Sequence, residues 1–211
     1  MNLITPLILG FITAFIGIIP PGLINMTAAK VNLKEGKNNA LWFILGAVLV
    51  IFFQVFLALL FARVIDSRPD LVALLREVGL GIFVMLTIYF LTIAKKPKDK
   101  IRKLKKNSVA NRFFLGILLS GLNFFPIPYY VFVSVGLASI QLFFFDIVTI
   151  SIFVTGVLLG SFSAFYCYIA FLKKIENKTD FILKNMNTIM GSITGFVSAM
   201  TLYTIIKYYW K

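Results

Sequence analysis

Long apolar runs, several of them free of charged residues, constrain this chain more than any other feature of its sequence. A helix that crosses a bilayer needs about 20 mainly apolar residues, whereas a strand of a membrane barrel needs about 10 alternating ones. The runs here are continuous, so we predict an all-α membrane protein with six transmembrane helices. They cover approximately residues 3–29, 38–62, 71–93, 113–136, 143–172 and 186–209.

Composition excludes a water-soluble fold and several kinds of chemistry. Hydrophobic residues make up 60% of the chain and charged residues 14%, which leaves too little polar surface for a globular protein. There is no histidine, and Cys167 is the single cysteine. Histidine relays, metal sites and disulfide or dithiol chemistry are therefore disfavoured. We expect no metal, no cofactor, no catalytic residues and no enzymatic activity.

The net charge of +13 comes from basic residues that flank the apolar runs. Such residues contact anionic lipid and mark the cytoplasmic side, so we predict membrane lipid as a partner and no nucleic acid. The densest cluster lies in residues 95–112, and placing it inside puts sixteen basic residues inside and five outside. We predict a multi-pass protein of the bacterial cytoplasmic (inner) membrane with both termini outside. A regulatory or partner-binding role of residues 95–112 is the alternative.

The two halves of the sequence resemble each other. Gly10 and Pro20 recur as Gly116 and Pro126 at an offset of 106 residues. At a slightly larger offset, a second set recurs: Gly81, Thr87 and Tyr89 as Gly195, Thr201 and Tyr203. A repeat of three spans enters the membrane in opposite directions in its two copies. We therefore predict two inverted-topology three-helix repeats, residues 1–94 and 113–211, joined by a basic cytoplasmic linker at residues 95–112.

Prolines interrupt the first and fourth spans at corresponding positions, in Pro20-Pro21-Gly22 and in Pro126-Ile127-Pro128. A proline inside a helix lacks an N–H donor and displaces the carbonyl four residues earlier, so Phe124 is among the residues expected to have a freed carbonyl. Unpaired backbone is tolerated in a membrane where it is buried in protein or lines a cavity, and paired breaks point to a transport site. The alternative is a simple kink at each position.

Neutral polar side chains lie near the two breaks and complete the predicted substrate site. The N–H groups that begin the helix after the first break could bind an anion such as a carboxylate. Each polar residue could instead hydrogen-bond between helices. The predicted substrate-binding residues are Pro20, Pro21, Gly22, Asn25, Thr27, Gln54, Asn123, Pro126, Pro128 and Tyr129.

Two further features bear on assembly and coupling. Gly156 and Gly160 have the Gly-x-x-x-Gly spacing that permits close helix contact, so a homodimer is possible. The middle of every predicted span lacks acidic and basic residues, and Asp146 is the nearest carboxylate, expected at the membrane interface.

The first third of the chain resembles the LysE superfamily of small bacterial amino-acid exporters, whose first span ends in a Pro-Gly-Pro break. Here the break is Pro20-Pro21-Gly22-Leu23, and Gly36 and Gly46 fall in register with family glycines. Asn123, before Pro126, is similar to the family's Asn-Pro pair. The family's acidic residue in span two falls near Ile51 in this chain. The resemblance implies ion-coupled export of amino acids or related small solutes by alternating access.

Two other functions remain open from the sequence. A noncatalytic assembly or lipid-contact protein would use the basic linker for binding and the helices only as anchors. A membrane redox carrier on a six-span scaffold is the weaker alternative, because one cysteine cannot form a redox pair within the chain.

Overall fold

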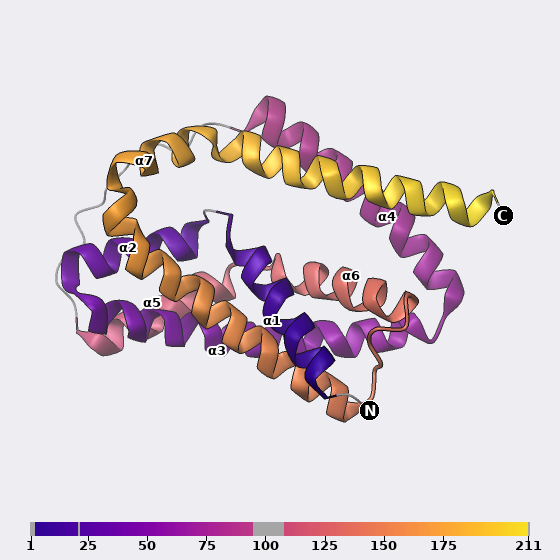
Figure 1. Ribbon diagram of the computed structural model, residues 1–211, viewed down its shortest axis with the longest axis horizontal. Coiled ribbons are helices and arrows are strands. Elements are labelled where there is room, and N and C mark those ends of the chain that lie inside the picture. The colour runs from indigo at the N-terminus through magenta and orange to yellow at the C-terminus, as the bar shows by residue number, and fades with distance from the viewer. Residues whose placement is uncertain (1–2, 21, 95–107, 211) are drawn as a thin grey trace. The chain divides into compact units, whose positions relative to one another are not determined.

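The computed structural model (Figure 1) describes residues 3–20, 22–94 and 108–210, and every regular element in these ranges is a helix. A short π-helical turn, η1, follows α4 directly. The elements in chain order are α1 (Ile4–Ile18), α2 (Leu23–Glu35), α3 (Lys37–Asp66), α4 (Pro69–Ile88), η1 (Tyr89–Ile93), α5 (Val109–Gly121), α6 (Pro126–Ser139) and α7 (Ile147–Tyr209).

The helices break at both places where prolines predict it. α1 and α2 are bent by 77° relative to each other, and α5 and α6 by 61°. By length and composition, α3 and the Ile147–Ala170 part of α7 can each cross a membrane, and each bent pair can form one more span. The described residues therefore hold two to four candidate spans. The six-span count stays a prediction.

The helices gather into two compact units, and each unit takes segments from both halves of the sequence. Unit 1 contains residues 1–63 and 100–177, and unit 2 contains residues 64–99 and 178–211. Unit 1 therefore holds α1, α2, α5, α6, most of α3 and the first part of α7. Both predicted broken spans lie in this unit.

Glycines let α1 approach the first part of α7 closely, where the two helices cross in Figure 1. A Cβ atom on Gly10 would overlap the carbonyl oxygen of Phe153, and one on Gly156 would overlap that of Leu7. Gly160 meets the carbonyl of Phe11 in the same way. The Gly-x-x-x-Gly spacing thus serves a contact within the chain, so it gives no support to the predicted homodimer.

Glycines also allow α3 and α5 to approach each other closely. A Cβ atom on Gly46 would overlap the carbonyl oxygen of Phe113, and one on Gly116 would overlap that of Phe43. Gly10 and Gly116 are the glycines that the sequence repeat aligns. The helix before each break therefore packs, through its aligned glycine, on a long helix from the other half of the sequence.

The core of unit 1 consists of apolar side chains of the long helices, including Phe43, Ile44 and Val55 of α3 and Phe153 of α7. Other large apolar side chains of α3 face outward, among them Phe53, which is 62% exposed. A helix that is apolar on both its packed and its exposed side is typical of a membrane span.

In unit 2, α4 and η1 lie against the last part of α7 in opposite directions. The Thr87 hydroxyl donates to Thr194 Oγ1 at 3.0 Å, and the Asn187 side chain donates to the Ala94 carbonyl at 2.6 Å. The second bond satisfies a backbone carbonyl where η1 ends. Thr87 belongs to the repeated pattern that the sequence places in the third predicted span.

Candidate functional site: the two helix breaks

The first break is held by one buried side chain, Asn25 of α2. Its Nδ2 group donates to the carbonyls of Ile18 and Pro20, both at 2.8 Å, and its Oδ1 atom accepts from the Gly22 amide at 2.6 Å. Both ends of the amide are thus used inside the break. These three backbone groups of the break are thus satisfied locally, as burial in an apolar environment requires.

A second donor reaches the first break from another helix. The Tyr168 hydroxyl of α7 donates to the carbonyl of Ile19, the residue that follows α1. Sequence reasoning missed Tyr168, because only the fold brings the first part of α7 beside α1.

The second break is held by Gln54 of α3. Its Nε2 group donates to the carbonyls of Ser120 at 3.1 Å and Asn123 at 2.8 Å. Gln54 is 7% exposed, so this amide lies within the protein. An amide side chain therefore satisfies the freed carbonyls at each break, from the following helix in the first case and from a neighbouring helix in the second.

The carbonyls that Gln54 caps are not the one expected to be freed by proline in the helix. The Phe124 carbonyl, expected to be free, accepts from the Ile127 amide at 3.3 Å. α5 ends at Gly121, several residues before Pro126, so the helix has already unwound when it reaches the proline. The carbonyls that depend on a side-chain donor are accordingly those of Ser120 and Asn123.

Tyr129 brings the two break regions into contact. Its hydroxyl, in the first turn of α6, donates to the Thr13 carbonyl of α1 at 2.8 Å. Its ring also covers Gly17, where an added Cβ atom would lie 3.2 Å from the Tyr129 hydroxyl oxygen. A side chain at Gly17 would therefore press on Tyr129. The sequence places Tyr129 near its own break, and the structure adds its contact with α1.

The other predicted site residues have simpler positions. Thr27 Oγ1 donates to the Leu23 carbonyl within α2, and Asn123 meets Gln54 through its backbone. Pro126 and Pro128 both lie in the first turn of α6, Pro20 and Gly22 lie between α1 and α2, and Pro21 falls outside the described residues. The structure thus joins Asn25 to the first break and Gln54 to the second, and it brings Tyr129 of the second broken span against α1 of the first.

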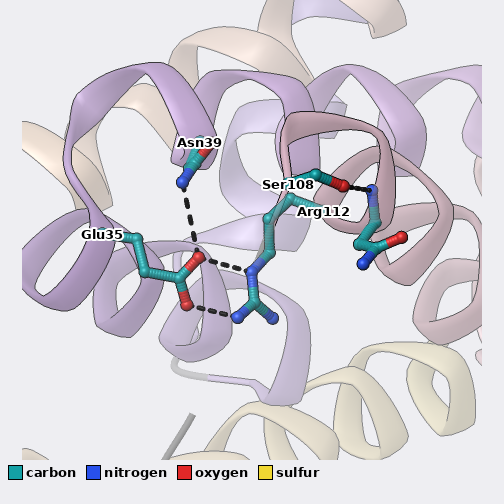
Figure 2. Close-up of polar contacts among 5 residues, drawn as sticks. Glu35, Asn39, Ser108 and Arg112 are labelled. Atoms are coloured by element: carbon teal, nitrogen blue, oxygen red, sulfur yellow. Dashed lines mark hydrogen bonds and ion pairs between the residues drawn. The ribbon is translucent and has the colours of Figure 1, made fainter. Parts of the chain in front are cut away.

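A buried ion pair, absent from the sequence-based site, joins α2 and α5 at the ends of these helices that lie away from the breaks (Figure 2). Arg112 of α5 donates through Nε to Glu35 Oε2 at 2.7 Å and through Nη2 to Glu35 Oε1. The two side chains are 2% and 1% exposed. Arg112 was expected with the linker lysines at the lipid surface; it lies instead in the first turn of α5, turned into the protein.

The only signal for this pair was one acid, Glu35, among lysines at the end of α2. Sequence alone does not show that the start of α5 returns to this point. Asn39 adds a further hydrogen bond to Glu35 Oε2 at 3.4 Å. Because α2 follows the first break and α5 precedes the second, the ion pair connects the two broken spans.

Asp146, the carboxylate at the start of the fifth predicted span, directly precedes α7. Its Oδ1 atom accepts from the amides of Val148 at 3.1 Å and Thr149 at 3.0 Å. This is the usual N-cap arrangement of an acidic residue. The contacts of Asp146 thus account for it as a structural residue.

The bent helix pairs, their buried amide caps and the apolar outer surface define a helical membrane protein whose spans are broken as in transporters. The sequence model of the LysE type translocator family matches residues 15–204. The chain therefore belongs to the LysE family of translocators, which are transporters and not enzymes. No match was found among curated proteins or among solved structures.

Replacing Asn25 by alanine should destabilise the protein, because the carbonyls of Ile18 and Pro20 and the Gly22 amide would lose their partner. A buried unsatisfied polar group costs about 1–3 kcal/mol, so we expect a lower melting temperature in detergent. The matched control is Thr27→Ala, which removes only a bond within α2 and should melt like the unmodified protein. Equal melting of both variants would contradict the role of Asn25.

Proposed function

We propose that this protein exports amino acids or related small solutes across the bacterial cytoplasmic membrane by ion-coupled alternating access. The two broken spans form the substrate site. Family membership supports transport of a small solute, and the features of unit 1 support the position of the site.

The contact of Tyr129 with α1 is the observation that carries this proposal. Discontinuous helices in corresponding positions of two repeats are the usual place of a transporter's binding site. Tyr129 lies three residues after Pro126, and Gly17 lies three residues before Pro20. Contact between them places two breaks, about a hundred residues apart in sequence, next to each other.

The glycine contacts support the proposed inverted repeat. α1 packs on α7 and α5 packs on α3, so each broken span uses the long helix of the opposite half. Within each pair the two helices run parallel. Leu7 contacts Gly156 and Phe11 contacts Gly160. In the other pair Trp42 contacts Phe113, and Gln54 donates to the Asn123 carbonyl. This is the exchange that a pseudo-two-fold axis between two repeats would produce.

The start of α2 suits the carboxylate of an amino acid. The first N–H groups of a helix lack partners within the helix, and the helix dipole favours negative charge there. Leu23, the first residue of α2, is 70% exposed, so no other part of the described chain covers its side chain. We propose that the amides of Leu23 and Ile24 face the carboxylate.

Counterflow in proteoliposomes tests transport, substrate and coupling together. The purified full-length chain should exchange at least one labelled amino acid from a panel of alanine, threonine, leucine, glutamate and lysine. An imposed pH gradient should change the rate if protons are the coupling ion, and a sodium gradient should do so if sodium is. Absence of exchange for the whole panel, with the protein folded and inserted, would reject amino-acid export.

Tyr129→Phe is a sharper probe of the site. It should keep the ring over Gly17 and lose the bond to the Thr13 carbonyl, and so reduce exchange severalfold at unchanged folding. Tyr166→Phe is the control, because that hydroxyl bonds only Lys37 among the described residues, at 2.7 Å. Equal exchange by the two variants would argue against the joined breaks as the site.

A further inference from the structure

The two amide side chains at the breaks are used differently, and the difference leaves one acceptor open. Asn25 uses its oxygen and its nitrogen inside the first break. Gln54 uses only its nitrogen at the second break. Among the residues that the structure describes, Gln54 Oε1 is buried and has no hydrogen-bond partner.

The orientation of the Gln54 amide follows from its neighbours. Carbonyl oxygens accept hydrogen bonds and cannot donate them, so the NH₂ group must face the carbonyls of Ser120 and Asn123. A flipped amide would set oxygen against two oxygens. The open position is therefore an acceptor.

The position of this acceptor follows from the geometry of an amide. Oε1 lies about 2.3 Å from Nε2 in the same planar group, by ordinary covalent dimensions. Nε2 is 2.8 Å from the Asn123 oxygen. The free oxygen is consequently close to the second break and to the Asn123 carbonyl.

The Asn123 carbonyl can add a second acceptor to this position. The Ser120 carbonyl already accepts from Gln54 and from the Asn123 amide at 3.1 Å. The Asn123 carbonyl accepts from Gln54, and a carbonyl oxygen has two lone pairs. A ligand with several N–H donors on one atom fits this pair of neutral oxygens.

We propose that Gln54 Oε1 accepts a hydrogen bond from the α-ammonium group of the amino acid that this protein carries. This assignment rests on the proposed function and adds which chemical group is recognised, and by which atom. An unpaired buried oxygen is costly, so a donor that fills it is favoured. A neutral acceptor also holds a cation less firmly than a carboxylate would, and a transporter must release what it binds.

The test uses counterflow of the panel amino acid that the wild-type protein exchanges fastest, with two unlabelled competitors. One competitor is the corresponding deaminated acid, which lacks the nitrogen. The other is the N-trimethyl form, which keeps the positive charge but has no N–H donor. We expect each to compete about tenfold or more less well than the unlabelled amino acid, as for a lost hydrogen bond to a charged group.

Gln54→Lys separates recognition from capping. The lysine ammonium can still donate to the Ser120 and Asn123 carbonyls, but it replaces the acceptor with a positive charge. Competition by the amino acid should fall about tenfold or more, while competition by the deaminated acid stays unchanged. Thermal unfolding in detergent reports whether the Gln54→Lys variant folds. If the variant does not fold, the N-trimethyl competitor on wild-type protein tests the role of Gln54 Oε1.

The outcomes distinguish the inference from the function on which it rests. If the wild-type protein exchanges no amino acid, both fail. If it exchanges amino acids but the N-trimethyl form competes equally well, only the role of Gln54 Oε1 fails. That role also fails if water or a metal cation, instead of the ammonium group, occupies this position. The inference would also be overturned if, in a folded Gln54→Lys variant, competition by the amino acid and competition by the deaminated acid fell equally.

Discussion

Replacing Arg112 by methionine is expected to lower the free energy of unfolding by about 3–5 kcal/mol, the usual cost of breaking a buried ion pair. The change would leave the Glu35 carboxylate buried without its bidentate partner. In a protein whose total stability is about 5–15 kcal/mol, such a loss should sharply reduce the amount of folded protein. Thermal unfolding in detergent and yield after purification measure it.

The double variant Glu35→Met with Arg112→Met separates the charge from the packing. Removing both members of a buried ion pair leaves no uncompensated charge and is often nearly neutral. We therefore expect the double variant to melt well above the single one. Arg63→Met, at an exposed arginine of α3, is the control and should change little. A single variant as stable as this control would contradict the buried pair.

The second large effect is expected from Gly116→Leu, which should separate α5 from α3. Even the first carbon of the new side chain would overlap the backbone carbonyl of Phe43, and backbone cannot rotate away as a side chain can. Overpacking costs about 1–3 kcal/mol, occasionally more. Because Gln54 reaches the second break from α3, separation should also disturb that break, and exchange should fall with stability.

Gly136→Leu is the matched control for this change. Gly136 lies in α6, also in a helix of the second broken span, and an added Cβ atom there has open space. It should leave the melting temperature close to that of the unmodified protein. If the two leucine variants behaved alike, the close approach of α5 to α3 would be wrong. Gly10→Leu should repeat the effect of Gly116→Leu at the contact of α1 with α7.

Much of the site could be predicted because lipid makes unpaired backbone expensive. Pro20 and Pro126 identify both breaks from the sequence alone, and Asn25 lies close enough in sequence to the first break to be suspected as its partner. Gln54 could be suspected only as a polar residue in an apolar helix. Its partners lie more than sixty residues away in the chain, so no local pattern identifies them.

Two residue roles read from the sequence depend on tertiary partners that no local pattern indicates. Arg112 was grouped with the linker lysines because a charge at the end of an apolar run normally faces lipid headgroups and water. It is buried because Glu35, from a distant segment, compensates its charge. Gly156 and Gly160 pack against α1, so their spacing gives no support to a homodimer, which stays a prediction. In each case a tertiary partner decides which of two ordinary roles the residue has.

The sequence by itself determined that this chain belongs in a membrane, that it is helical, and where two of its helices break. These properties depend on composition and on proline, which act within a short stretch of chain. The tertiary structure alone decided how each break is satisfied, which helix approaches each glycine, and that Glu35 meets Arg112. Those outcomes depend on which distant segments become neighbours, and packing, not local propensity, selects them.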